Sequence, residues 1–132
     1  MVSEPVEVDV KYLILIYHNP ESRRIWASFS ESEQAAGLAE YAALNEDLAA
    51  SGELIASEAL ADPSLARHVR RDGDQAIAID GPFAEAKEQL AGFYLVDCAN
   101  DERAIEIAGR IPEADLGMIE VRPTMVYTAA EM

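Results

Sequence analysis

A cluster of charged side chains surrounds one turn in the second half of the sequence. Asp80 ends an expected strand, a Gly-Pro turn and Phe83 come next, and three charged residues that include Lys87 follow within the same nine positions, 80–88. An Asp before such a turn often hydrogen-bonds the turn itself, but it could also act as a base or ligand anchor at a pocket mouth. Lys87 could pair with a neighbouring carboxylate or hold an anion. We take Asp80 as a candidate catalytic residue, and Phe83 and Lys87 as candidate ligand contacts.

A histidine follows the first apolar run of the chain. His18 comes directly after the run 10–17 and directly before Asn19-Pro20. A histidine at the carboxyl end of a strand is well placed for general acid–base chemistry, although a histidine in a turn is often an ordinary loop residue. We take His18 as the second candidate catalytic residue.

Three residues inside expected strands complete the predicted ligand site, namely Tyr17, Glu58 and Arg122. Tyr17 and Glu58 could point into a space between two sheets, or they could belong to the core or a dimer interface. A carboxylate inside an apolar strand needs a partner if it is buried. Arg122 is a plausible partner for Glu58 or for Asp80.

Metal and cofactor motifs are not evident in the sequence. Two histidines and many carboxylates are present, but they show neither H-x-x-x-H nor EF-hand spacing. Cys98 is the single cysteine, so it can form neither an internal disulfide nor a cysteine-based zinc site. No glycine-rich phosphate loop occurs. We therefore predict no metal and no cofactor.

The composition describes an acidic globular chain. It has 132 residues, with 25 Asp and Glu against 10 Lys and Arg, for a formal net charge of −15. Such a chain repels phosphate backbones and anionic lipid, so nucleic acid and membranes are not expected partners. No apolar run approaches the length of a membrane span. We predict a cytoplasmic protein with a flexible leader at 1–8 and a single domain at 9–128.

Hydrophobic periodicity predicts alternating strands and helices. Ser30 and Glu33 have the spacing of a capping box, an apolar stripe from Leu38 to Leu48 follows, and Gly52 ends the helix. Asp72-Gly73-Asp74 is typical of a hairpin turn. The expected helices span 31–51 and 101–111, and the expected strands span 10–17, 53–60, 67–71, 75–80, 90–98 and 118–127.

This order of elements predicts a ferredoxin-like α+β sandwich with a hairpin inserted between two βαβ-like halves. Helices on one face of a four-stranded sheet leave the other face bare. The first strand is apolar on both sides, and an exposed patch of that size is a liability. We therefore predict a homodimer in which two sheets pack face to face.

The turn segment resembles the DGPF family, a branch of the YCII-related proteins. The Asp-Gly-Pro-Phe tetrapeptide that gives the family its name is present here at 80–83. Family members usually continue with Ala-Glu-Thr-Lys-Glu, and this sequence has the same residues at 84–88 except for Ala86 in place of Thr. The sequences at 11–17, 45–48, 51–54 and 120–123 also resemble family segments, so the similarity extends over about 11–127. The resemblance implies a dimeric α/β-barrel fold.

The resemblance leaves two functions open. YCII-type relatives have a His–Asp pair that is proposed as a catalytic dyad, and one relative dechlorinates a chlorinated hydroxyquinol. The histidine of that pair lies in the first helix of those relatives, and the helix expected at 31–51 contains no histidine. We predict a cofactor-free dimer that binds a small organic molecule, with possible proton-transfer or lyase chemistry. The alternative is a non-enzymatic regulatory protein, because DGPF proteins are frequently encoded beside extracytoplasmic-function sigma factors.

Overall fold

The computed structural model describes residues 10–83 and 87–125. The predicted leader, part of the charged segment after the turn, and the end of the last predicted strand lie outside these residues. The described elements follow in the order β1 (Tyr12–His18), α1 (Pro20–Ser28), α2 (Glu31–Ser51), β2 (Leu54–Ala59), η1 (Pro63–Leu65), β3 (Arg67–Asp72), β4 (Gln75–Asp80), β5 (Gln89–Val96), α3 (Asp101–Gly109), η2 (Pro112–Leu116) and β6 (Ile119–Pro123).

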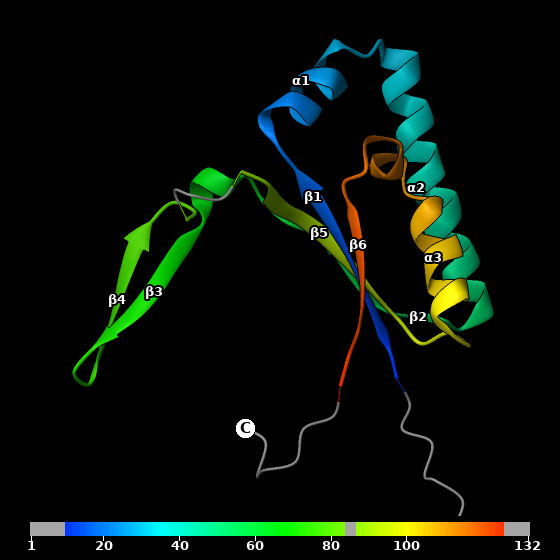
Figure 1. The fold of residues 1–132 in the computed structure, drawn as a ribbon. Helices are drawn as coiled ribbons and strands as arrows, with labels where there is room; N and C mark the ends of the chain where they lie inside the picture. The colour runs from blue at the N-terminus through cyan, green and yellow to red at the C-terminus, as the bar shows by residue number, and fades with distance from the viewer. Residues whose placement is uncertain (1–9, 84–86, 126–132) are drawn as a thin grey trace, which may run out of the picture.

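The main sheet has the strand order β2-β5-β1-β6, and its neighbouring strands are all antiparallel. The two central strands, β1 and β5, begin the two βαβ-like halves. The strands that end these halves, β2 and β6, form the two edges of the sheet. This arrangement is the α+β fold predicted from the sequence, and it is consistent with a ferredoxin-like fold. Helices α2 and α3 cover one face of the sheet (Figure 1).

The core lies between that face and the two helices. Alternation along β1 turns Ile14 and Ile16 toward the helices, and the same alternation in β5 turns Tyr94 and Val96 inward. The helices contribute Leu44, Leu48, Ile107 and Ile111. Leu38 was expected in the same helical stripe, but its side chain is 61% exposed. The stripe is therefore shorter than predicted, because the first turns of α2 extend past the sheet.

The helix boundaries follow from local capping. The Ser30 side chain accepts a hydrogen bond from the backbone of Glu33, and the Glu33 carboxylate accepts one from the Ser30 backbone, so the predicted capping box is confirmed. Gly52 has a positive φ of 78° at the end of α2, which favours glycine. Asn100 caps α3 as expected.

Helix α1 was not predicted, because His18-Asn19-Pro20 was interpreted as a turn. Asn19 is in fact an N-cap whose side chain accepts from the backbone of Ser22, and Pro20 occupies the first helical position. Proline is favoured there because its missing N–H would have no intrahelical partner. A short helix therefore starts immediately after His18.

The predicted hairpin is confirmed as a separate two-stranded sheet. Strands β3 and β4 pair with each other from Arg67 opposite Asp80 to Asp72 opposite Gln75, and neither strand joins the main sheet. Gly73 has a positive φ of 61° in the turn. The hairpin projects away from the main sheet on the side opposite α2 and α3 (Figure 1).

Candidate functional site

His18 is the last residue of β1, where it lies opposite Gln89 at the start of β5. Its Nε2 atom lies 3.5 Å from Oε2 of Glu113. The imidazole side chain is 37% exposed, whereas the Glu113 side chain is only 16% exposed. The pair therefore combines a solvent-accessible base with a largely buried carboxylate.

Glu113 lies in η2, which begins at Pro112 and brings the carboxylate against α2. The Tyr41 hydroxyl on α2 donates to Oε1 of Glu113 at 2.6 Å and also contacts Oε2. Burial acts to raise the pKa of Glu113, but contacts from His18 and Tyr41 outweigh it, so the pKa lies below its ordinary value. The surroundings of Glu113 thus favour its anionic form, with the Tyr41 hydroxyl donating to it and the His18 ring beside it.

Two tyrosines extend this polar group beneath α2. Burial, and then the hydrogen bond to anionic Glu113, raise the pKa of Tyr41 well above its ordinary value, so the hydroxyl keeps its proton. The Tyr94 hydroxyl on β5 donates to Oδ1 of Asn45 at 2.6 Å. Burial also raises the pKa of Tyr94. Tyr41 therefore holds Glu113 directly, while the Tyr94 hydroxyl is held by Asn45.

Arg23 of α1 reaches the strand residue that lies opposite His18. Arg23 on α1 donates from Nη2 to Oε1 of Gln89 at 3.3 Å, and Gln89 is the ladder partner of His18. Helix α1, which carries Arg23, is capped by Asn19 directly after the histidine. Arg23 and His18 thus lie at the same end of the β1–β5 ladder.

The three candidate residues inside strands lie on the sheet face that the helices do not cover, namely Tyr17, Glu58 and Arg122. Tyr17 follows the buried Ile16 and points to the opposite face by strand alternation. Partial burial and the nearby Glu120 carboxylate raise its pKa, and Arg122 opposes that effect. Glu58 is exposed and lies opposite Phe93. The structure thus brings Tyr17 and Arg122 together on the helix-free face, with Glu58 on the outer strand of the same sheet.

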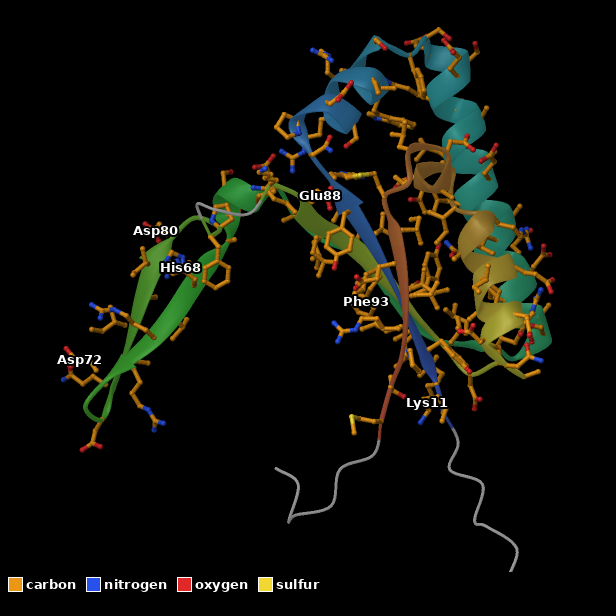
Figure 2. All side chains as sticks on the ribbon, viewed as in Figure 1. Lys11, His68, Asp72, Asp80, Glu88 and Phe93 are labelled. Carbon is orange, nitrogen blue, oxygen red and sulfur yellow. The ribbon has the colours of Figure 1, made fainter. Side chains whose placement is uncertain are left out.

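Two of the candidate residues lie on or beside the β3–β4 hairpin, namely Asp80 and Phe83. Asp80 is 88% exposed at the end of β4 and forms an ion pair with Arg67 at 3.2 Å. The Phe83 ring packs on the ring of His68, with centroids 5.1 Å apart. Figure 2 shows Asp80 and His68 on the hairpin, apart from Phe93 on the main sheet. Lys87 is exposed and lies two positions before Gln89, the ladder partner of His18. Among the described residues, none of these three candidates forms a hydrogen bond or an ion pair with His18 or Glu113.

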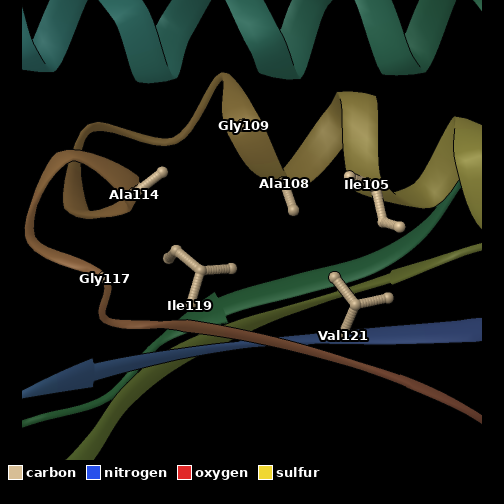
Figure 3. Close-up of a pocket in the computed structure, with 7 residues that line it drawn as sticks. All are labelled: Ile105, Ala108, Gly109, Ala114, Gly117, Ile119 and Val121. Atoms are coloured by element: carbon tan, nitrogen blue, oxygen red, sulfur yellow. The ribbon is translucent and has the colours of Figure 1, made fainter.

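Two surface hollows lie away from His18 as well. One, of about 300 Å³, lies between α3, η2 and β6 (Figure 3), and its lining carries no ionisable side chain: Ile105, Ala108, Gly109, Ala114, Gly117, Ile119 and Val121. The second, of about 400 Å³, borders α2 and includes Glu40, Arg110 and Asp115.

Within residues 10–83 and 87–125, no three His, Cys, Asp or Glu side chains form a group suited to a metal ion. No helix in those residues is long and apolar enough to span a membrane.

The sequence suggested His18 as a candidate, but it did not suggest Glu113, the residue that His18 faces in the structure. Glu113 is 95 positions away in a short 3₁₀ helix, and no local spacing connects the two residues. Tyr41 was interpreted only as part of the apolar stripe of α2. One signal was present, because a tyrosine in a core stripe needs a partner for its hydroxyl. The acceptor, however, could be found only from the packing of η2 against α2.

The chain is similar to known proteins over most of its length. Residues 10–128 match the family model described as the YCII-related domain. The chain is also similar to an uncharacterised protein of Rhizobium meliloti (strain 1021), with 32% identity over 123 residues. That similarity covers 92% of this chain and 97% of the relative. The matched region includes β1, α2, β5 and η2, which carry the residues described above: His18, Tyr41, Asn45, Tyr94 and Glu113.

Proposed function

The chain belongs to the YCII-related family, and we propose that it binds a small organic molecule beside His18 and moves a proton to or from it without a cofactor. The tetrapeptide Asp80-Gly81-Pro82-Phe83 is the reason to assign it to the DGPF branch within that family. The observation that carries the function is the pairing of the accessible His18 imidazole with the buried Glu113 carboxylate.

His18 acts as the proton acceptor in this proposal. With Nε2 directed at Glu113, the other ring nitrogen, Nδ1, faces the bound molecule and takes a proton from it. A C–H bond next to a carbonyl breaks, an N–H bond forms on the imidazole, and the electron pair moves onto the carbonyl oxygen. The imidazolium then returns a proton to complete an isomerisation, or the electron pair expels a leaving group in a lyase reaction.

Glu113 positions the ring and stabilises its charged state. An anionic carboxylate beside an imidazole favours the imidazolium that forms on proton transfer. The separation of 3.5 Å is longer than a standard hydrogen bond, and such contacts commonly tighten when a substrate binds. Tyr41 holds the carboxylate from the other side, so it can move only a short way.

Solvent exchange tests the proposal without knowledge of the natural substrate. Wild-type protein is incubated in D₂O with a panel of 2-oxo acids and β-dicarbonyl compounds, and deuterium incorporation is followed by NMR. We expect exchange above that caused by an equal concentration of free imidazole, with a loss of about 100-fold in His18→Gln. Glu113→Gln is expected to retain part of the activity.

His68→Gln is the matched control, because His68 is the other histidine of the chain and lies on the hairpin. This variant is expected to exchange at the wild-type rate. Equal losses in the two histidine variants would refute a specific role for His18. If the wild type exchanges no compound faster than free imidazole does, the proposal is wrong, and the alternative of a non-enzymatic regulatory protein is favoured.

The remaining candidates keep the roles predicted for them, on other surfaces. Tyr17, Glu58 and Arg122 are proposed ligand contacts on the helix-free face of the sheet, and Phe83 and Lys87 are proposed contacts on or beside the hairpin. Asp80 is the second proposed acid–base group. Because these surfaces are separate within one chain, the ligand site as first predicted requires a homodimer that brings hairpin and sheet together.

A further inference from the structure

Strand β6 forms one edge of the main sheet, and among the described strands it pairs only with β1. Next to its first residue, the carbonyl of Met118 accepts a hydrogen bond from the backbone of Tyr17. Beyond its last residue, the N–H of Thr124 donates to the carbonyl of Lys11. Backbone groups alternate in direction along an antiparallel strand. The even-numbered residues of β6 therefore face β1, and the odd-numbered residues face away from the sheet.

The outward-facing residues of β6 are Ile119, Val121 and Pro123. Ile119 and Val121 each direct one N–H and one carbonyl outward, whereas Pro123 has no N–H to donate. Among the residues that the structure describes, no helix, strand or turn supplies a partner for these four groups of Ile119 and Val121. Such an edge is a ready template for one more strand, and the proline limits that strand to a short length.

An apolar hollow of about 300 Å³ lies directly beside this edge, between β6 and α3 (Figure 3). The side chains of Ile119 and Val121 line it from the sheet, and Ile105 and Ala108 line it from α3. Ile105 is 55% exposed although it is a large apolar residue. The hollow is thus open to apolar side chains of a molecule that lies along β6.

Edge and hollow select the same pattern in an added strand. In an antiparallel pair, the residues opposite Ile119 and Val121 would exchange hydrogen bonds with them and carry their side chains on the same face. Those two side chains, one residue apart from each other, would both enter the hollow. The residue between them would lie opposite Glu120, on the other face of the sheet. The fitting segment therefore has apolar residues on both sides of one exposed position.

The charges around the edge specify that exposed position. Glu120 is exposed on β6, and a cationic residue directly opposite it in a neighbouring strand is favourable. Asp101 and Glu102 are also exposed, and they lie one helical turn from Ile105 on α3. The arginines of the same region do not offset these acids, because those at 103 and 110 already form ion pairs with carboxylates.

We propose that the β6 edge, defined as the outward backbone groups of Ile119 and Val121 with the hollow beside them, binds an extended segment of another protein. The segment has the pattern apolar–basic–apolar and extends the main sheet by one strand. A second copy of this chain is a poor occupant, because two chains with a formal charge of −15 repel each other. This binding does not depend on the proton transfer proposed for His18.

A short synthetic peptide tests the edge directly. The probe is acetyl-Thr-Val-Lys-Val-Thr-amide, whose neutral threonine avoids the exposed Arg122. Amide NMR of the full chain should show saturable shifts at Ile119 and Val121. We expect about tenfold weaker binding when glutamate replaces the lysine, and a loss of at least about tenfold when both valines are N-methylated and cannot donate. No binding of the probe at millimolar concentration, or equal binding of the N-methylated peptide, would overturn the proposal.

Two matched variants test the hollow. Ile105 lines it, whereas Leu38 lies on α2 outside it, and the two side chains are 55% and 61% exposed. Ile105→Ser is expected to raise the dissociation constant of the probe about tenfold. Leu38→Ser should leave it unchanged. Equal effects of the two variants, or no effect of Ile105→Ser, would show that the hollow does not hold the peptide and would refute the proposed mode.

Amide hydrogen exchange of the chain alone tests the other occupants of the edge. Unpaired edge amides exchange rapidly. We expect fast exchange at Ile119 and Val121 in dilute and in concentrated protein, and exchange at least about tenfold slower with saturating probe. Slow exchange in dilute protein would mean that the chain itself already pairs this edge. Slowing on concentration alone would assign the edge to a second copy. Either result contradicts the proposal.

Discussion

Removal of the Tyr41 hydroxyl group, which donates to Glu113, should lower the stability of the fold by an amount that depends on pH. Tyr41→Phe deletes the donor to Glu113 but keeps the ring that packs against the core. A hydrogen bond to a charged group contributes about 1.5–3 kcal/mol. For a domain of this length, about 3 °C of melting temperature corresponds to each kcal/mol. We therefore expect a decrease of about 5–9 °C at pH 7.

The pH dependence of this stability loss shows whether the acceptor, Glu113, is charged. The pKa of Glu113 lies below its ordinary value in the folded chain, so the stabilisation is present above the unfolded pKa of about 4.3 and is lost as pH falls through the folded value. The difference between wild type and Tyr41→Phe is therefore largest near neutral pH. It should shrink progressively below about pH 4.

Tyr94→Phe is the matched control. Its hydroxyl donates to the neutral Asn45 side chain, so the expected loss is about 1 kcal/mol and is nearly constant over the same pH range. Thermal melting of the three proteins between neutral and acidic pH measures both effects. A loss for Tyr41→Phe that is as small and as pH-independent as that for Tyr94→Phe would refute the idea of a charged acceptor.

Three further substitutions test the fold that carries the site. Gly92→Ala would place a Cβ atom 2.9 Å from the backbone oxygen of Glu58, so a strand must move, and urea unfolding should show a loss of about 1–3 kcal/mol. Asn19→Ala removes the cap of α1 and should cost about 1 kcal/mol in the same assay. Arg103→Met breaks the contacts of 2.8 and 3.0 Å with Glu53. The hydrogen bond from Arg103 lowers the pKa of Glu53, so the melting difference should be present at neutral pH and decrease as pH falls below about 4.

Local signals in the sequence predicted most of the fold. The capping box at Ser30, the positive φ of Gly52 and the hairpin turn at Gly73 depend on a few adjacent residues, and all three are confirmed. Helix α1 was missed although Asn19-Pro20 carried its start signal. The same dipeptide is common in turns, and the helix continues for only nine residues with no strong apolar stripe.

The candidate site was less predictable, because its contacts are distant in sequence. His18 could be selected from its place after a strand, but its association with Glu113 depends on where η2 packs. The motif around Asp80 attracted attention for its clustered charge, yet the hairpin holds that aspartate in a solvated ion pair with Arg67. Residue type and local spacing indicate which groups can do chemistry, while the long-range packing decides which of them meet.

The central claim is that Glu113 is an anion paired with His18. Carboxyl ¹³C NMR of the full chain, titrated from neutral to acidic pH, measures this directly in the wild type and in His18→Phe. We predict that the wild-type Glu113 pKa lies below its ordinary value and that it rises in the variant, which keeps a ring but has no nitrogen to face the carboxylate. An unchanged Glu113 pKa in the variant, or a wild-type pKa at or above the ordinary value of a glutamate, would contradict the pairing on which the proposed proton transfer depends.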